Sequence, residues 1–265
     1  MNADAPQPLV DAARLTAELV GPGAVWTQVT TVATTGSTNA DLAASARAGA
    51  PSGTVLVSDH QSAGRGRFTR VWEAPPRTSL AISVLLRPPA AIDARRWLWL
   101  PLVTGLAVAD GVRAATGVDV ELKWPNDVLV GGRKVCGILA ERVDAGSGPA
   151  AILGMGVNTT LAEHELPVPS ATSLALAGAD VDASTVAAGI LRALGTWYTR
   201  WLAAEDLRAE YAARCSSVGR RVRVQLSADE FVEGWASGVD RDGCLLVGVA
   251  GGERAFAAGD VVHLR

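Results

Sequence analysis

The pattern of apolar residues changes near residue 216, and this change limits the folds open to the chain. Before it, apolar stretches long enough for helices alternate with short apolar runs typical of strands. After it come five short alternating segments divided by Gly or Asp turns: RVRVQL, FVEGWASGVD, CLLVGVA, ERAFAAG and DVVHLR. Short strands at this spacing are typical of a small β-barrel. We therefore expect a large α/β domain over residues 1–215 and a small all-β domain over 217–265.

The larger part predicts a central mixed sheet with flanking helices, an α/β (α+β) fold. Helical spacing and capping residues predict helices over 9–20, from Asp41 onward, over 97–115 and within 182–214. Apolar runs predict strands over 25–33, 54–61, 79–87, 118–123, 126–131, 134–143 and 150–157. Strands and helices interleaved in this way favour a sheet that is covered by helices.

The composition favours a folded cytoplasmic protein and disfavours several classes of partner. Hydrophobic residues make up 49% of the chain, which is enough for a core. A net charge of −3 leaves no general basic surface for a phosphate backbone, so DNA binding is disfavoured. The three cysteines form no C-x-x-C pair, which predicts neither a disulfide framework nor a zinc site. The first 13 residues lack the basic start of a signal peptide, and the apolar run 97–109 is shorter than the ~20 residues of a membrane span.

A segment rich in Arg and Gly, residues 62–77, has no periodic pattern and predicts a long loop. Within it, Arg65, Arg67 and Arg70 are spaced by Gly64 and Gly66, which allow the backbone to fold closely over a ligand. Guanidinium groups bind carboxylates and phosphates bidentately. The loop is therefore a candidate anion site, with a solvated surface loop as the alternative.

A second segment, KWPNDVLVGGRKVCGIL, joins a proline corner to an apolar strand that carries one lysine. Asn126 and Asp127 follow Pro125 and can bond the backbone or a ligand, and Lys134 stands where it can reach a phosphate or a carboxylate. Gly137 allows a ligand to lie against the strand. The alternative is a tight hairpin with Lys134 extended toward water.

Two shorter segments carry weaker signals. In GMGVN, residues 154–158, two glycines allow a backbone or a planar ring to approach, and Asn158 can bond an amide or an adenine edge. In TTGSTN, residues 34–39, the polar side chains either line a pocket or cap the next helix. The three histidines are scattered and no Walker A sequence occurs, so we predict no metal site and no P-loop.

Taken in the order of the chain, these four segments resemble the biotin–protein ligase family. The resemblance rests on S-T-N at 37–39, G-R-G-R followed by a Trp, K-W-P-N-D with a Lys seven residues on, and G-x-G-x-N. It covers residues 37–158 closely, and the β-rich tail is similar to the family's SH3-like C-terminal domain. It implies a class II synthetase-like catalytic domain, with ATP, Mg²⁺ accompanying ATP, and biotin as substrate. It also implies formation of biotinyl-5′-AMP and transfer of biotin to a lysine of the biotin carboxyl carrier protein of acyl-CoA carboxylases.

The resemblance assigns roles by position. The residues implied to bind biotin are Ser37, Thr38, Asn39, Gln61, Arg65, Gly66, Arg67, Lys134 and Gly137. Those implied to bind ATP or the adenylate are Arg65, Arg67, Trp72, Asn126, Asp127, Lys134 and Asn158. Arg65 and Lys134 are the expected catalytic residues, because both reactants are anions and cations stabilise the developing charge. On chemistry alone, Asp127 is a candidate base for the carrier lysine.

The chain departs from the family's pattern at two places. Phe68 and Thr69 replace an Arg-Gly pair of some members, which makes the loop less basic. Only 36 residues precede Ser37, too few for the winged helix-turn-helix of the bifunctional members, so we expect the short form, with no operator binding and no membrane contact. We expect a monomer or a weak homodimer.

Three other functions are compatible with parts of the sequence. A lipoate–protein ligase has a related fold and the same two-step chemistry, but G-R-G-R with K-W-P-N-D points away from it. A DNA-binding biotin sensor is opposed by the acidic pI of about 5.7. A non-catalytic biotin-binding module has no need of Arg65 and Lys134, because the ureido ring is neutral.

Overall fold

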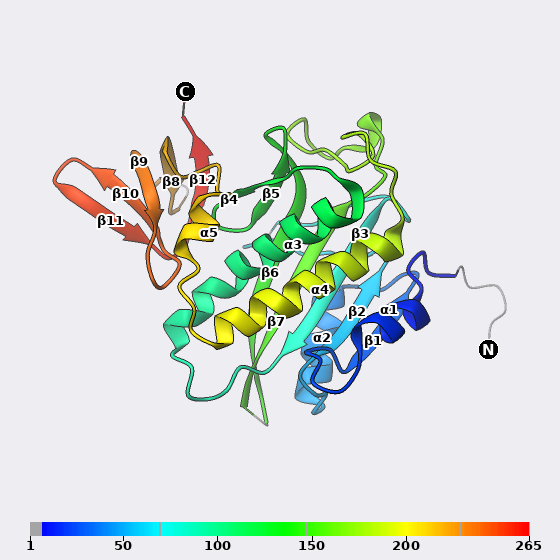
Figure 1. The fold of residues 1–265 in the computed structure, drawn as a ribbon. Helices are drawn as coiled ribbons and strands as arrows, with labels where there is room; N and C mark the ends of the chain where they lie inside the picture. The colour runs from blue at the N-terminus through cyan, green and yellow to red at the C-terminus, as the bar shows by residue number, and fades with distance from the viewer. Residues whose placement is uncertain (1–6, 69, 147, 228, 265) are drawn as a thin grey trace.

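The fold contains two sheets of different kinds (Figure 1). The computed structural model describes residues 7–68, 70–146, 148–227 and 229–264. The larger sheet has seven strands in the order β1-β2-β3-β7-β6-β5-β4, with β1 and β2 parallel and the other neighbours antiparallel. Its strands are β1 (Gln28–Val32), β2 (Thr54–Ser58), β3 (Ser79–Leu86), β4 (Glu121–Lys123), β5 (Asp127–Val130), β6 (Arg133–Ala145) and β7 (Gly148–Asn158). The expected central mixed sheet is thus confirmed.

Helices cover both faces of this sheet. On one face α3 (Leu100–Thr116) and α4 (Ala183–Leu202) lie side by side, and α2 (Thr38–Arg47) packs on the other (Figure 1). Alternate residues of a strand point to opposite faces, so Val55 and Val57 of β2 join the core under α3 and α4, and Leu56 joins the smaller core under α2. Every residue of β2 and β3 is therefore buried, which explains why these strands are continuously apolar in sequence.

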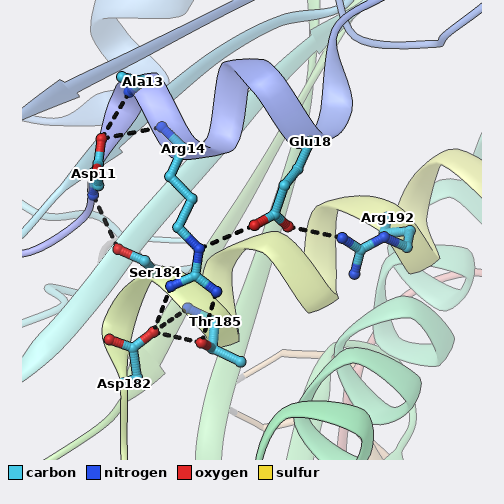
Figure 2. A network of polar contacts seen from close by, with 8 residues as sticks. All are labelled: Asp11, Ala13, Arg14, Glu18, Asp182, Ser184, Thr185 and Arg192. Atoms are coloured by element: carbon cyan, nitrogen blue, oxygen red, sulfur yellow. Dashed lines mark hydrogen bonds and ion pairs between the residues drawn. The ribbon is translucent and has the colours of Figure 1, made fainter.

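The N-terminal helix α1 (Ala12–Leu19) is fastened to α4 by charged side chains (Figure 2). Arg14 pairs with Glu18 at 2.9 Å and with Asp182 at 3.1 Å, and Glu18 also pairs with Arg192 at 2.8 Å. Beneath these pairs the fully buried Leu15 belongs to the larger core. Exposed ion pairs contribute little, so burial of the apolar face supplies most of the attachment.

The helical stretch that contains α3 is longer than the apolar run 97–109 seen in the sequence. The helical stretch Ala94–Thr116, which includes η1 (Ala94–Trp99), is long and apolar enough to cross a membrane by length and composition. Asp110 does not end it, because its carboxylate accepts hydrogen bonds from Trp197 Nε1 at 2.7 Å and Arg214 Nη1 at 2.6 Å. The most apolar window of this stretch is 67% buried in the fold, as in the core helix of a globular protein.

The second sheet has five antiparallel strands in the order β11-β10-β9-β8-β12. They are β8 (Arg220–Gln225), β9 (Phe231–Val239), β10 (Leu245–Val249), β11 (Gly252–Phe256) and β12 (Asp260–His263), and the short helix α5 (Arg208–Ala212) precedes them. Two buried indoles join this sheet to the rest: Trp124 Nε1 donates to the Gly243 carbonyl at 3.1 Å, and Trp99 Nε1 donates to the Arg241 carbonyl at 2.7 Å. Both indoles therefore hold the turn between β9 and β10 against the α/β part of the chain.

Candidate active site

A cavity of about 320 Å³ lies where the start of α2, the 62–77 loop, the proline corner and β12 meet on β3, β6 and β7. Arg65 and Lys134, from two separate stretches of sequence, both border it. The cavity also brings together nearly all of the other predicted site residues: Ser37, Thr38, Asn39, Gln61, Gly66, Arg67, Trp72, Asn126, Asp127 and Gly137. The anion site and the polar pocket predicted from the sequence are therefore one space.

Asn158 is the predicted residue that this cavity does not include. Its side chain is buried, and its Nδ2 donates to the Thr172 carbonyl at 2.9 Å. Its backbone carbonyl accepts from Leu174 N at 3.0 Å. In this structure Asn158 therefore fixes the segment that follows η2 (Glu163–Glu165), and its role as an adenine contact stays a prediction.

Side chains from the start of α2 form a polar wall of the cavity. Ser37 is the N-cap of α2, with its Oγ 3.5 Å from Ala40 N, as the capping interpretation predicts. Gln61 Oε1 accepts from both Thr38 N at 2.8 Å and Thr38 Oγ1 at 3.1 Å. Thr38 and Asn39 are both buried, so these groups depend on one another for hydrogen bonds.

Arginines of the 62–77 loop are held by carboxylates from two different strands, β6 and β12. Arg65 Nη2 lies 3.0 Å from Glu141 Oε2 on β6, and both Arg67 and Arg70 pair with Asp260 at the start of β12. The backbone of the loop closes on itself through Trp72 N, which donates to the Gly64 carbonyl at 3.0 Å. Thr69, part of the expected departure from the family pattern, lies outside the described residues.

Arg67 is the most enclosed of these arginines, with 18% of its side chain exposed. Its Nη1 donates to Asn126 Oδ1 at 3.1 Å and to the Gly259 carbonyl at 3.1 Å. Burial lowers the pKa of Arg67, and the charges of Asp260 and Asp127 oppose this effect. Arg67 thus connects the loop, the proline corner and the second sheet.

Lys134 lies at the start of β6 with its ammonium group in the cavity. Its Nζ is 2.5 Å from Asp127 Oδ1 and 5.9 Å from the centre of the Trp72 ring. Cys136, two residues along the strand, is fully buried and burial raises its pKa to about 12, as expected of a core thiol. Lys134, Asp127 and Trp72 border the cavity, whereas Cys136 is not among its lining residues.

The floor of the cavity is made by glycines of neighbouring strands, and the indole of Trp72 packs on it. A Cβ atom on Gly156 would lie 2.5 Å from Trp72 Cε2, and one on Gly137 would lie 3.1 Å from Trp72 Cζ3. A side chain at residue 156 would therefore displace the ring. A side chain at residue 137 would press on the ring and on the end of Lys134, whose Nζ would lie 3.0 Å from the Cβ atom. The planar group that the glycines admit in this structure is the protein's own Trp72.

Three residues of the site were not found by sequence reasoning. Ser83 interrupts the apolar strand β3 and bonds Asn39 at 2.6 Å, so its polarity in a buried strand was an available signal. Glu141 follows the apolar part of β6 and looks like an ordinary exposed strand residue. Asp260 is 190 residues from Arg70, and no local pattern connects the two.

The same chain organisation is found in known proteins. Residues 32–158 match the Biotin/lipoate A/B protein ligase family, and residues 218–264 match the Biotin protein ligase C terminal domain. The chain is 43% identical to a biotin–[acetyl-CoA-carboxylase] ligase of Mycobacterium tuberculosis, over 98% of this chain and 97% of the relative. It is 31% identical to the bifunctional ligase/repressor BirA of Bacillus spizizenii, over 80% of this chain and 66% of that protein.

The fold is similar to solved structures as well. A biotin protein ligase from Aquifex aeolicus in complex with biotin and ATP superposes with a TM-score of 0.76 at 26% identity. The match covers 91% of this chain and 100% of that one. The sequence match and the shared arrangement of the two sheets lead to one conclusion: the chain belongs to the biotin protein ligase family.

Proposed function

We propose that this chain is a biotin–protein ligase, which joins biotin to ATP as biotinyl-5′-AMP and transfers biotin to a lysine of a carrier protein. The observation that carries the proposal is the single cavity bordered by Arg65, Arg67 and Lys134 on one side and by Thr38 and Asn39 on another. The cations suit an acyl-phosphate, and the polar wall suits the ureido ring of biotin.

In the first step a carboxylate oxygen of biotin attacks the α-phosphorus of ATP, and the bond to pyrophosphate breaks. Charge accumulates on the phosphate oxygens in the transition state, where Lys134 and the loop arginines stabilise it. The ion pairs of these cations with Asp127, Glu141 and Asp260 keep the charged groups beside the cavity before the substrates bind. Such preorganisation reduces the reorganisation needed at the moment of reaction.

In the second step the amine of the carrier lysine attacks the acyl carbon, the acyl–phosphate bond breaks, and AMP leaves. The amine loses a proton in this step. Asp127 lies at the cavity and is paired with Lys134, so its principal role in our proposal is to hold Lys134 in place. Its role as the base for the carrier lysine stays a prediction.

Magnesium enters this scheme as part of the MgATP substrate. Within the described parts of the chain, no three His, Cys, Asp or Glu side chains are grouped so that they could hold a metal ion. The donor set of these residues therefore does not fit a resident metal.

The name of the Mycobacterium tuberculosis relative includes acetyl-CoA-carboxylase, which supports a carboxylase as the partner. We propose that the acceptor is the biotin-carrier domain of such an enzyme. The cytoplasmic location, the absence of DNA and membrane contacts, and the monomeric or weakly dimeric state stay predictions.

Covalent transfer is the direct test. The protein is incubated with MgATP, labelled biotin and a purified biotin-carrier domain, and label on the carrier is measured. Matched reactions omit ATP, replace biotin by lipoate, or use a carrier whose acceptor lysine is changed to arginine. We expect labelling in the complete reaction alone. Lipoate transfer at a rate equal to that of biotin would instead support the lipoate ligase alternative, and no transfer would contradict the proposal.

A further inference from the structure

Glu141 stands between the polar wall and the arginine loop and bonds both of them. Its Oε2 accepts from Asn39 Nδ2 at 2.7 Å and from Arg65 Nη2 at 3.0 Å. Only 28% of the Glu141 side chain is exposed. One carboxylate oxygen therefore joins two parts of the site that come from different elements.

The position of Glu141 follows from the alternation of β6. Residues 137, 139 and 141 lie on one face of the strand, because successive side chains of a strand point to opposite faces. Gly137 and Leu139 border the cavity, and Glu141 comes next on that face. Ile138, on the other face, belongs to the core under α3. The strand thus carries the carboxylate to Asn39 and Arg65, two side chains that border the cavity.

The carboxylate also determines which way the amide of Asn39 points. Ionised carboxylates and peptide carbonyls only accept hydrogen bonds, and Nδ2 of Asn39 donates to Glu141 and to the Leu139 carbonyl at 3.2 Å. Its Oδ1 accepts from the fully buried Ser83 hydroxyl at 2.6 Å. A flipped amide would place its oxygen against two acceptors. The Ser83 hydroxyl can donate or accept, so it does not select the orientation by itself.

We infer that Glu141 is a positioning residue for biotin. It fixes the Asn39 amide so that the carbonyl oxygen is the group offered on the polar wall, and it holds the Arg65 guanidinium beside the cavity. The ureido ring of biotin has two N–H donors and one acceptor, so a wall with a fixed acceptor selects one orientation of the ring. This inference rests on the proposed function, since it concerns the biotin subsite.

The test compares Glu141→Gln with Glu163→Gln. Glu163 also pairs with an arginine of β6, Arg133 at 2.8 Å, but its side chain is 67% exposed. Arg133 does not border the cavity, whereas Asn39 and Arg65, the partners of Glu141, both do. Both variants therefore lose one charge and one ion pair. Pyrophosphate release is measured against biotin and against ATP, leakage of biotinyl-AMP is measured without carrier, and the melting temperature is recorded.

For Glu141→Gln we expect the KM for biotin to rise roughly tenfold, because bonds to a charged acceptor are about twice as strong as neutral ones. Leakage should rise with it, whereas the KM for ATP and the melting temperature should stay close to those of Glu163→Gln. In an Asn39→Ala background the same change should have a clearly smaller effect on the KM for biotin, because the amide that it orients is gone.

An unchanged or lower KM for biotin in Glu141→Gln would overturn the inference. So would parallel losses for both substrates with a lower melting temperature, which would assign Glu141 to the fold alone. These results are read against the unaltered protein. If that protein makes no adenylate from biotin and ATP, the proposed function fails; if it does and Glu141→Gln behaves like Glu163→Gln, only the role of Glu141 fails.

Discussion

Trp72 Cε2 lies 2.5 Å from the place where a Cβ atom of residue 156 would be, so the indole ring can occupy its position only because that residue is glycine. The ring comes from the arginine loop, and the glycine comes from the middle of the sheet. This pair therefore sets how closely the loop approaches the floor of the cavity, and it leads to the first prediction.

Gly156→Ala should displace Trp72 and slow adenylate formation by roughly 10- to 100-fold, because misplacement by about 1 Å has effects of this size. Pyrophosphate release at saturating substrates measures it. Gly238→Ala is the control, since a Cβ there meets nothing within 4 Å and Gly238 lies in β9. Equal rates for the two variants would show that the position of Trp72 does not matter for the reaction.

Lys134→Ala should slow adenylate formation by roughly 100- to 1000-fold, the usual loss when a group that stabilises transition-state charge is removed. The change also leaves Asp127 without its ion pair beside the substrate anions. Single-turnover formation of biotinyl-AMP separates this effect from substrate binding. A normal single-turnover rate with a raised KM would assign Lys134 to binding instead.

Arg65→Ala should affect retention of the intermediate more than its formation. The side chain borders the cavity and is 46% exposed, so we expect it to cover the bound intermediate from the solvent side. We expect leakage of biotinyl-AMP to rise roughly tenfold, from the loss of charge-assisted hydrogen bonds. Release is followed by filtration in the absence of carrier. Unchanged leakage would remove Arg65 from this role.

Asp260→Asn should loosen the arginine loop by removing its ion pairs with Arg67 and Arg70. Exposed pairs are worth about 0.2–1 kcal/mol, so amide hydrogen exchange over residues 64–68 should accelerate roughly two- to fivefold. The comparison is Asp144→Asn, which removes an exposed pair with Arg142 elsewhere on β6. Equal protection of the loop in both variants would contradict a link through Asp260.

His263 should make the protein sensitive to acid. Burial lowers its pKa to about 4, and the nearby charges of Lys123 and Arg220 act in the same direction. The folded pKa lies below the ordinary value, so the neutral histidine favours folding above pH ~6.5, and this contribution is lost as the pH falls toward 4. The side chain is partly exposed, which reduces the expected loss to about 1–2 kcal/mol.

Replacing His263 with glutamine, which can still bond the Ser217 hydroxyl that lies 3.0 Å from His263 Nε2, should remove most of this acid sensitivity. Melting temperatures at pH 7 and pH 4.5 give the comparison. The exposed His164→Gln serves as control and should keep the loss of the unaltered protein. If His263→Gln loses as much stability as the control, the buried histidine is not the cause.

The sequence predicted the strands and the segments that border the cavity well, because local patterns of residues determine them. Apolar runs located β3, β6 and β7, and the glycines of 154–158 predicted the approach of a planar ring. Partners from distant parts of the chain were not predictable. Nothing near Glu141 signals that Asn39 will lie beside it, and nothing near Asp260 signals Arg67, because tertiary packing alone creates these contacts. For Asn158 a local pattern did suggest a ligand contact. In the structure its amide Nδ2 donates to the Thr172 carbonyl.

The hydrogen bond from Arg67 to Gly259 ends on a main-chain oxygen, which every amino acid possesses. Substitution in β12 can alter the charge that faces the loop, yet it leaves this acceptor in place as long as the strand begins at the same point. This contact therefore depends on where β12 begins and not on which side chains β12 carries.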